Sequence, residues 1–447
     1  MSASARSRFA PSTSSSARCG RWPASGGCCP SPRNIAFDAI IVGAGAAGLS
    51  AARRLANSGA RVVVLEVGDR VGGRAHTVVR EGFALDLGCG WLHSGERNPW
   101  TAVAEAAGLT VDRSPARWDM QWRDLGFPPS DQAAFGAAFD AFDTEVERRV
   151  ALPDVPLADA LPAAGDWAGA VDAIVGYLDG VEAGAVSLHD HAAFDAAASD
   201  NNWRVREGLG TAVASIAAGL DVRLNTAVTA IAVGNDAVRV TTSAGVVEAA
   251  TAIVTVSTAT LGRITFTPEL PGHAAAATDL PLGDVGKVFL HVDGPTDFPV
   301  DGHLRGHPRA LRSASHRLRP FGWPIIESYF GGPFAADLTA AGPAAAVDAM
   351  ITELCGLLGS DWRPRLRPLA VSDWRGAPFI GGAWSHARPG RRDARRAIVE
   401  PVAGRLFFAG EAGALDDVGT AHGAHATGVA AASAALAVLT QAQPVAQ

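Results

Sequence analysis

Two short apolar runs flank a glycine-rich stretch at the start of the regular part of the chain. Residues 37–42 (FDAIIV) and residues 61–66 (RVVVLE) are rich in β-branched side chains, so each predicts a strand buried on both faces. Residues 43–59 lie between them and follow a helical pattern that stops at Gly59, the residue type that most often ends a helix. Strand, turn, helix and strand within about 30 residues predict a right-handed β-α-β unit.

The middle of the chain follows the periodicity of helices over most of residues 91–202. Apolar side chains at every third or fourth position from Phe135 to Val150 form one stripe, which is typical of a helix packed in a domain core. Pro128, Pro129 and Ser130 precede the stripe and indicate where this helix begins.

Strand patterns return in the second half of the chain. We expect strands at residues 222–224, 228–233, 237–242, 246–249, 252–256, 287–292, 325–330 and 406–409. Residues 423–439 predict a terminal helix. Because both ends of the chain have nucleotide-binding character and the middle does not, we expect interleaved domains rather than domains in series.

The composition limits the classes of protein that fit. The chain has 447 residues, of which 48% are hydrophobic and 19% charged, so it can bury a sizeable core in two or three domains or in one large interleaved unit. A net charge of −7 argues against nucleic acid as a partner. No apolar run reaches 18 residues, and the stretch 426–439 is too short to span a bilayer, so we expect no membrane span and a buried terminal helix.

The first 35 residues differ from the rest of the chain. Up to Arg33 they contain five arginines, nine serines and no acid, which resembles an organellar transit peptide; a disordered extension or an over-long start is the favoured alternative. Three of the five cysteines also lie there, which leaves Cys89 and Cys355 for the folded part. Their spacing predicts neither a metal site nor a disulfide framework, so we expect a reducing compartment, the cytoplasm.

The glycine-rich stretch carries the first chemical motif, Gly43-x-Gly45-x-x-Gly48. In this motif one glycine allows a tight turn, the next lets the backbone approach a pyrophosphate, and the last lets the helix pack on the strand. The phosphates would then meet the N-terminal residues of the helix, Ala46 and Ala47. Glu66 lies at the end of the second strand, 18 residues after Gly48, where an acid can bind ribose hydroxyls. Together these residues predict a dinucleotide site.

A second motif narrows the cofactor. Residues 71–74 (VGGR) have no use in NAD enzymes, and with residues 86–93 (DLGCGWLH) they resemble the FAD-binding start of the flavin-containing amine oxidases. That family includes monoamine oxidases, polyamine oxidases and lysine-specific histone demethylases, and the polyamine oxidases are closest in motif style. The resemblance implies that Gly73 and Arg74 contact the cofactor phosphates. It also implies that the backbone of residues 88–91, with Gly88, Gly90 and Trp91, runs beside the flavin.

The resemblance extends over nearly the whole chain after residue 35. Residues 208–261 are similar to the middle FAD segment of the family, with Val228 at the adenine, and residues 404–424 are similar to its closing segment. There Gly410 would contact the cofactor, Glu411 would bind the ribityl chain, and Ala421, with Thr420, would meet the pyrimidine end of the flavin. Trp374 is expected beside the flavin. One departure is that residues 66–68 read Glu-Val-Gly where the family often has Glu-Ala-Arg.

Lys287 is the only lysine among 38 basic residues. The resemblance places it where the family has a lysine that holds a water against flavin N5, which makes it the principal catalytic candidate. An amino group can keep that water hydrogen-bonded and can lose its charge when desolvated, whereas arginine cannot lose its charge. His93, which the resemblance places at the mouth of the active site, is the second catalytic candidate, because it could handle an amine proton near neutral pH.

The residues that would contact the substrate depart from the family pattern. Trp384 and His386 stand where the family usually has tyrosines that frame the amine, and Thr420 falls at the opposite position. With two tyrosines in the whole chain, a cage of two tyrosines is not expected. Ala383 falls near the position of the cysteine that monoamine oxidases link to the flavin, so FAD is expected to be bound non-covalently.

These observations predict an α/β, two-lobed FAD-dependent amine oxidase fold, with a Rossmann-type FAD-binding domain and an interleaved α+β substrate domain. The expected boundaries are 1–35 for the tail, 36–92, 206–262 and 395–440 for the FAD-binding domain, and 93–205 and 263–394 for the substrate-binding domain. The expected reaction is hydride transfer from a polyamine or another primary or secondary amine to flavin N5, with O2 reduced to H2O2, by a monomer or homodimer.

Two alternatives remain open at this point. One is another FAD-dependent oxidoreductase of the same superfamily: a desaturase, a dehydrogenase or an amino-acid oxidase. The absence of arginine between Asp86 and His93 counts against an amino-acid substrate. The other alternative is a non-catalytic FAD-binding protein.

Overall fold

Strand β1 (Phe37–Val42) and the elements that follow it form the predicted β-α-β unit. A computed structural model describes residues 36–118, 120–162 and 165–441. Helix α1 (Ala46–Ala56) follows β1 and leads to β2 (Val62–Leu65), which runs parallel to β1. All of β1 from Ala39 onwards is buried, because it lies in the centre of a sheet with strands on both sides.

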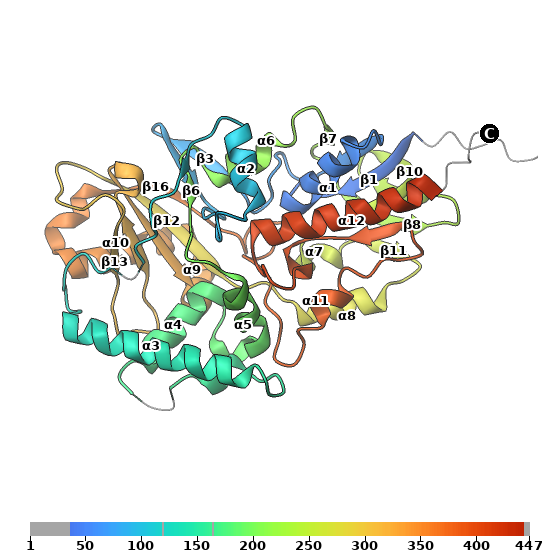
Figure 1. Ribbon diagram of the computed structural model, residues 1–447. Helices are drawn as coiled ribbons and strands as arrows, with labels where there is room; N and C mark the ends of the chain where they lie inside the picture. The colour runs from blue at the N-terminus through green and yellow to red at the C-terminus, as the bar shows by residue number, and fades with distance from the viewer. Residues whose placement is uncertain (1–35, 119, 163–164, 442–447) are drawn as a thin grey trace, which may run out of the picture. The chain divides into compact units, whose positions relative to one another are not determined.

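The sheet that contains β1 has eight strands, in the order β11-β8-β9-β10-β1-β2-β7, with β17 also paired to β10 (Figure 1). Its remaining strands are β7 (Asp221–Arg223), β8 (Val228–Val233), β9 (Val238–Thr242), β10 (Gly245–Val254), β11 (Thr265–Thr267) and β17 (Leu406–Phe408). This sheet therefore takes strands from the N-terminal, middle and C-terminal parts of the chain, which confirms an interleaved fold. The domain boundaries themselves stay a prediction.

The prediction of two strands at 246–249 and 252–256 is wrong, since one continuous strand, β10, runs through both. The expected break falls at residues 250 and 251, but Thr251 pairs with Ala39 of β1 and donates its hydroxyl to the Asp38 carbonyl oxygen. Pairing with β1 therefore supplies partners for Thr251 that the local sequence pattern did not indicate.

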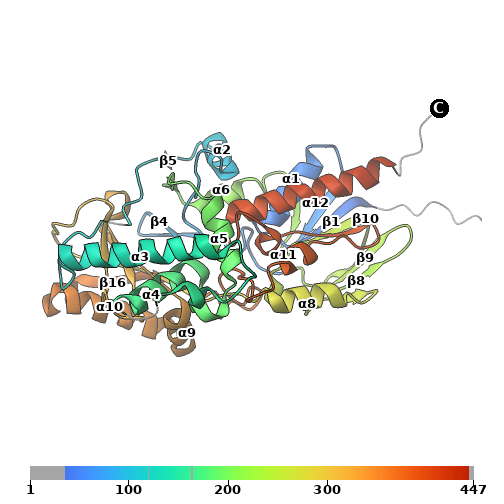
Figure 2. The same cartoon turned by 60° about the horizontal axis from the view of Figure 1, so that its bottom comes forward.

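Helices cover both faces of this sheet, as parallel strands require. On one face, α1 packs with α2 (Pro99–Ala106), α6 (Leu209–Ser215) and the terminal helix α12 (Ala421–Gln441). On the other face lie α7 (Thr258–Leu261), α8 (Pro271–Asp279) and α11 (Ala394–Ala397) (Figure 2).

Helix α12 is the one helix in the described part of the chain that is long and apolar enough to cross a membrane. It lies alongside α1 (Figure 1), and a Cβ built on its Gly428 would come within 2.2 Å of the Ala47 carbonyl oxygen. The same length and apolar character occur in core helices of soluble proteins, so they are weak grounds for a membrane span.

The second sheet is antiparallel, with the order β13-β14-β15-β12-β16. Its strands are β12 (Val285–Val292), β13 (Gly302–Arg305), β14 (Ser315–Leu318), β15 (Ile325–Gly331) and β16 (Leu366–Val371). Its apolar face packs on α9 (Gly332–Ala341) and α10 (Pro343–Leu358). Two small antiparallel pairs complete the described strands: the hairpin of β3 (Thr77–Arg80) and β4 (Phe83–Asp86), and the pair of β5 (Val111–Asp112) and β6 (Arg204–Val205), which are distant in the chain.

The helical middle of the chain forms α3 (Pro129–Arg149), α4 (Ala168–Asp179) and α5 (Leu188–Ala197). The stripe predicted on α3 is present, and Phe142 and Val146 are buried as expected. At the C-terminal end of the stripe Val150 is 46% exposed, and four residues of the stripe, Phe135, Phe139, Val146 and Val150, line a large cavity. Helix α3 therefore packs in the core and also lines the cavity.

Candidate active site

A cavity of about 2290 Å³ lies where the two sheets meet the helical region. It is larger than the roughly 300–1,000 Å³ of most ligand pockets, so it has room for a dinucleotide together with a substrate. Most of the predicted site residues line it: Gly43, Gly45, Ala46, Ala47, Glu66, Gly73, Arg74, Gly88, Gly90, Trp91, His93, Val228, Lys287, Trp374, Trp384, Gly410, Glu411, Thr420 and Ala421. Gly48 and His386 do not.

The glycine turn before α1 has the form that a phosphate site needs. A Cβ on Gly45 would meet nothing within 4 Å, so this glycine keeps the backbone open to the cavity. Gly48 instead faces the turn, where a Cβ would lie 2.0 Å from the Gly43 carbonyl oxygen, which is the helix-packing position of the motif. No side chain caps the N-terminus of α1, and its first turn contains no acid. Its N–H groups therefore suit the phosphates of FAD.

The Glu66 carboxylate stabilises this turn through hydrogen bonds to the backbone. One carboxylate oxygen accepts the Ala44 N–H at 2.7 Å, and the other accepts the Gly68 N–H at 2.8 Å. A Cβ on Gly68 would lie 3.1 Å from Glu66 Oε1, so a side chain there would crowd the carboxylate. Glycine at the position where the family often has arginine thus fits the way Glu66 is held in this chain.

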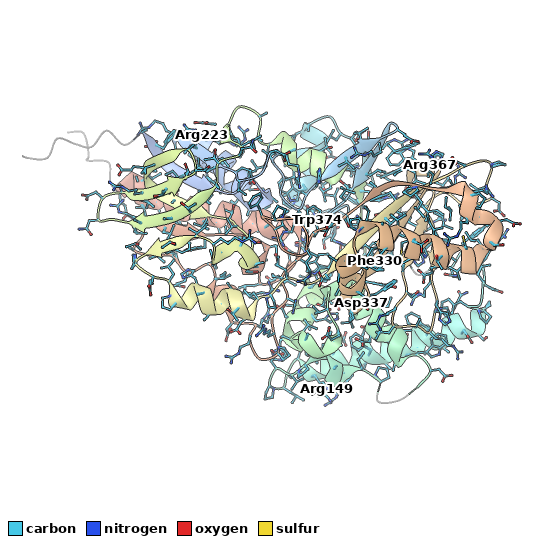
Figure 3. The ribbon with its side chains drawn as sticks, turned by 180° about the vertical axis from the view of Figure 1, so that it is seen from behind. Arg149, Arg223, Phe330, Asp337, Arg367 and Trp374 are labelled. Atoms are coloured by element: carbon cyan, nitrogen blue, oxygen red, sulfur yellow. The ribbon has the colours of Figure 1, made fainter. Side chains whose placement is uncertain are left out.

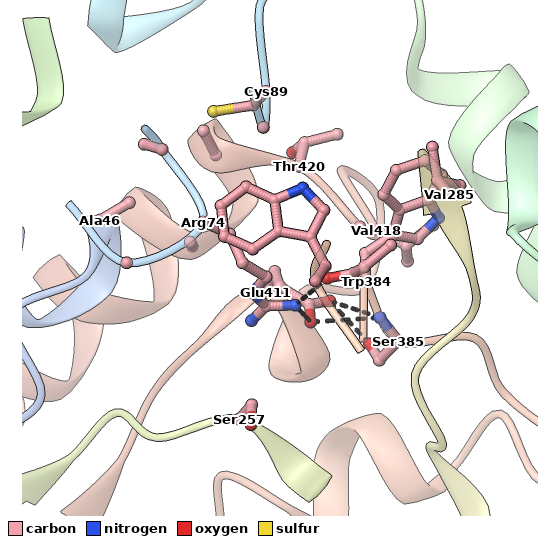
Figure 4. A pocket seen from close by; sticks show the side chains of 18 of the residues that line it. Ala46, Arg74, Cys89, Ser257, Val285, Trp384, Ser385, Glu411, Val418 and Thr420 are labelled. Atoms are coloured by element: carbon pink, nitrogen blue, oxygen red, sulfur yellow. Dashed lines mark hydrogen bonds and ion pairs between the residues drawn. The ribbon is translucent and has the colours of Figure 1, made fainter. Parts of the chain in front are cut away.

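Arg74 and Glu411, which the resemblance assigns to the phosphates and to the ribityl chain of the cofactor, form an ion pair of 2.7 Å (Figure 4). Arg74 also donates to the Ala383 carbonyl oxygen at 2.7 Å, and Glu411 accepts the Ser385 hydroxyl at 2.6 Å. Burial would raise the pKa of Glu411, but the Arg74 charge and the Ser385 hydrogen bond outweigh it and lower the pKa. An ionised carboxylate therefore faces the cavity, where a cofactor hydroxyl could donate to it.

A buried ion pair, which the sequence did not reveal, supports the residues around Glu411. Arg395 and Asp190 are 0% and 2% exposed, and their side chains form two hydrogen bonds of 2.5 and 2.7 Å. Arg395 also donates to the Ser385 hydroxyl and to the Ala412 carbonyl oxygen. The pair thus joins α5 and α11 to the residues around Glu411. No local motif could indicate it, because the partners are 205 positions apart.

Lys287 projects from β12 toward the 86–90 segment. Its Nζ donates to the Asp86 carbonyl oxygen at 3.0 Å and lies 3.1 Å from Oε1 of Glu327. A Cβ on Gly90 would lie 3.3 Å from this Nζ, so the only lysine of the chain adjoins the segment predicted to run beside the flavin. The sequence missed its partner Glu327, which comes from β15.

The surroundings of His93 do not fit the expectation that it handles an amine proton near neutral pH. Its Nδ1 lies 2.7 Å from Asn202 Oδ1, and burial lowers the pKa of the imidazole to about 4. The side chain is therefore neutral near pH 7, so it does not take up an amine proton there. Because the amide oxygen accepts, Nδ1 carries the proton and Nε2 is left as a hydrogen-bond acceptor.

His386 also needs a correction, because its side chain does not line the cavity. It is 5% exposed, and burial lowers the pKa of its imidazole, although the Asp179 and Asp190 charges act in the opposite direction. Its backbone N–H donates to the Pro281 carbonyl oxygen, and its side chain is buried outside the cavity. His386 is therefore a packing residue rather than a substrate contact.

The tryptophans occupy the cavity wall as expected. Trp374 lies between the two sheets (Figure 3), with its indole N–H donating to the Leu87 carbonyl oxygen at 3.0 Å. The Trp384 side chain projects into the space beside Arg74 and Glu411 (Figure 4). The two tyrosines also line the cavity, with ring centroids 5.9 Å apart, but both hydroxyls donate to backbone carbonyls.

Cys89 is the cysteine that lines the cavity. Burial, followed by the Asp86 charge, raises the pKa of its thiol to about 12. A thiol that stays protonated at neutral pH is a poor nucleophile, which fits a flavin held without a covalent bond.

A group of carboxyl side chains on the helical wall of the cavity was not predicted. They are Asp143, Glu147, Asp179, Asp195 and Asp200. Burial and then Asp195 raise the pKa of Asp143 to about 6. His191 lies among these acids, 2.8 Å from Asp179 and 3.4 Å from Asp195. The helical wall of the cavity is therefore rich in carboxyl groups.

Comparison with known proteins agrees with this geometry. Residues 158–436 match the family model described as flavin containing amine oxidoreductase, and residues 41–106 match that of an NAD(P)-binding Rossmann-like domain. Polyamine oxidase 4 of Oryza sativa subsp. japonica is 29% identical over 90% of this chain and 88% of its own. Lysine-specific histone demethylase 1B of Mus musculus is 28% identical over 88% of this chain and 52% of its own.

Among solved structures, wild-type putrescine oxidase bound to putrescine superposes with a TM-score of 0.75 at 20% identity, covering 90% of this chain and 99% of that one. This likeness concerns the fold and agrees with the two-sheet arrangement. The chain therefore belongs to the flavin containing amine oxidoreductase family and is an FAD-dependent amine oxidase whose FAD is bound non-covalently.

Proposed function

We propose that this enzyme oxidises polyamines, or other primary and secondary amines, at a C–N bond with oxygen as the electron acceptor. FAD, which the turn of residues 43–48 together with Arg74 and Glu411 would hold, would supply the redox chemistry: acceptance of a hydride from the carbon next to nitrogen and reoxidation by oxygen to give hydrogen peroxide. The names of the relatives, polyamine oxidase and putrescine oxidase, support this substrate class.

The acidic wall of the cavity is the observation that carries the proposal. Its carboxyl groups come from α3, α4, α5 and the segment that follows α5, and those of Asp179 and Asp195 contact His191. A polyamine carries several ammonium groups along an extended chain, and separated carboxylates can each attract one of them. A monoamine could use only one such contact.

His93 supports the chemical step in a different way from the one expected. A neutral amine is needed for hydride loss, and an imidazole with a pKa of about 4 is neutral at the same pH. Its Nε2 can accept a hydrogen bond from the amine without adding a positive charge, and Asn202 fixes the ring through Nδ1. We therefore assign His93 to orienting the amine.

The test is anaerobic flavin reduction with spermine, spermidine, putrescine and benzylamine, followed by peroxide detection in air. We expect the polyamines to reduce the flavin at lower concentrations than benzylamine. Asp143→Asn should raise the apparent Kd for polyamines about 10-fold, since a charge-assisted hydrogen bond is worth roughly 1.5–3 kcal/mol. Asp140→Asn, on the exposed side of the same helix, is the matched control and should have no effect.

Equal reduction by all four amines, with no effect of Asp143→Asn, would contradict the polyamine assignment. Flavin that is reduced by amines but gives no peroxide in air would identify a dehydrogenase. Flavin that none of the amines reduces would favour a desaturase or a non-catalytic FAD-binding protein.

Arg305 favours a second candidate, an amine that also carries a carboxylate. This side chain lines the cavity, lies 4.1 Å from the centroid of the Phe135 ring, and forms no ion pair among the described residues. Adding an acidic amino acid to the amine panel tests it. Preferential reduction by that compound, lost in Arg305→Gln, would favour an amino-acid oxidase.

We also propose that the protein acts in a reducing compartment, the cytoplasm, as a monomer or homodimer that is not anchored in a membrane. Cys89 and Cys355 are free thiols, and α12 packs alongside α1. Cell fractionation and light scattering of the purified protein test these points. Recovery in the membrane fraction, or a larger assembly, would contradict them.

A further inference from the structure

The face of the second sheet that looks into the cavity carries three charged side chains on neighbouring strands. Arg317 of β14 and Glu327 of β15 stand opposite each other in the strand register. Lys287 lies on β12 two residues from Phe289, the residue that pairs with Glu327. Because residues two apart share one face of a strand, the sheet brings all three charges to the cavity, which each of them lines.

The carboxylate of Glu327 bridges the two cations. Its Oε1 lies 3.1 Å from Lys287 Nζ and its Oε2 lies 3.3 Å from an Arg317 nitrogen, and all three side chains are 16% exposed or less. Burial would raise the pKa of Glu327, but the Arg317 and Lys287 charges outweigh it and lower the pKa to about 2. Glu327 is therefore ionised at neutral pH and can only accept hydrogen bonds.

These contacts leave the Lys287 ammonium with one remaining donor. An ammonium has three N–H groups; one meets Glu327 and another meets the Asp86 carbonyl oxygen at 3.0 Å. In the described part of the chain these are the two partners of Nζ. The missing side chain of Gly90 keeps space beside Nζ open, so the third N–H is available to a water or a reacting group in the cavity.

Arg317 holds the other end of the arrangement. Its guanidinium lies 4.2 Å from the centroid of the Trp91 ring, which belongs to the segment predicted beside the flavin. A lysine has four rotatable bonds and would sample many positions if nothing held its ammonium. Because Glu327 contacts both Arg317 and Lys287, it restricts the positions that the ammonium can take.

We propose that Glu327 is a positioning residue, which fixes the Lys287 ammonium so that its third N–H serves the flavin side of the cavity. No sequence motif marks this carboxylate, which becomes relevant only through the pairing of β12 with β15. The inference rests on the proposed function only where a reduction rate is measured.

The first test uses the fact that Lys287 is the only lysine. Labelling with ¹⁵N-lysine gives the holoenzyme a single side-chain ammonium resonance, and we expect slow hydrogen exchange because the group is buried and paired. Glu327→Gln should lose this resonance to fast exchange. The matched control Glu353→Gln removes another buried carboxylate, which bonds Ser313 and does not line the cavity, and should keep it. A wild-type resonance in Glu327→Gln would overturn the proposal.

The second test measures anaerobic flavin reduction by whichever amine reduces the wild-type enzyme. Glu327→Gln should slow the limiting rate about 10- to 100-fold with an unchanged apparent Kd, because misplacing a catalytic group by about 1 Å costs up to about 100-fold. The same change in a Lys287→Met background should have no further effect. An equal loss in both backgrounds would show that Glu327 does not act through Lys287.

A second variant separates loss of the Glu327 charge from a failure to fold. Glu327→Asp keeps the charge on a shorter side chain, so if Glu327→Gln does not fold, this variant should give a rate between those of wild type and Lys287→Met. A wild-type rate and a wild-type resonance in Glu327→Asp would count against the proposal. The resonance is measured without amine or oxygen, so the first test remains valid if the polyamine assignment fails.

Discussion

His191 makes the stability of this enzyme depend on pH in a defined window. The side chain is 4% exposed on α5 and lies between Asp179 at 2.8 Å and Asp195 at 3.4 Å. Burial would lower the pKa of the imidazole, but the charge and hydrogen bond of Asp179, together with Asp195, outweigh it and raise the pKa from 6.5 to about 9. The folded protein therefore binds the proton more tightly than the unfolded chain does.

The sign and size of the effect follow from this difference. A pKa that is raised on folding stabilises the protein fully below the unfolded value of 6.5, and the stabilisation is lost as the pH rises to about 9. Each pH unit of difference corresponds to about 1.4 kcal/mol, so the His191 contribution is about 3 kcal/mol. Because the group is almost completely buried, screening by solvent removes little of it.

The assay is the apparent free energy of unfolding in urea for the apo-protein between pH 6 and pH 10, for wild type and His191→Gln. Wild type should lose about 3 kcal/mol more than the variant between pH 6.5 and 9. His273→Gln is the control, since the ring of that buried histidine meets the Glu400 carbonyl oxygen and pairs with no carboxylate among the described residues, so the variant should keep the wild-type pH dependence. Identical pH profiles of wild type and His191→Gln would refute the reasoning.

Three further predictions concern the cofactor side. Asp190→Asn should destabilise the protein by about 3–5 kcal/mol, measured as thermal unfolding, because it leaves the buried Arg395 charge unpaired; an unchanged melting temperature would contradict this. Gly45→Ala should weaken FAD binding in a titration without lowering the apo-protein melting temperature, whereas Gly48→Ala should lower that temperature through its clash with the Gly43 carbonyl. Lys287→Met should keep FAD but lose much of the reduction or reoxidation rate in stopped flow; wild-type rates would refute its role.

The cofactor half of the site could be predicted from the sequence because its chemistry is local. The turn of residues 43–48 and Glu66 are set by positions close together in the chain, and the structure places the turn between β1 and α1 and Glu66 directly after β2. Lys287 was identifiable because it is unique in composition and lies in a family segment. The helix α12 and most strands were also predictable from their apolar patterns.

The errors arose where environment rather than residue type decides the chemistry. His93 was expected to titrate near neutral pH, but burial lowers its pKa to about 4, and burial is not a property of the residue. His386 follows the cavity-lining residues Trp384 and Ser385 in sequence, yet its side chain is buried and does not line the cavity. The stripe of α3 predicted packing but could not show that part of it faces a cavity.

By itself, the sequence determined the fold class, the cofactor and the family, because repeated short motifs in a set order encode the turns and strands that hold FAD. Only the tertiary structure decided the partners of the charged groups: Glu327 for Lys287, Asp190 for Arg395, and the acids that surround His191. Electrostatic interactions depend on distance and burial in three dimensions. Lys287 and Glu327, 40 positions apart, and Asp190 and Arg395, 205 positions apart, therefore become partners only when strands pair and helices pack.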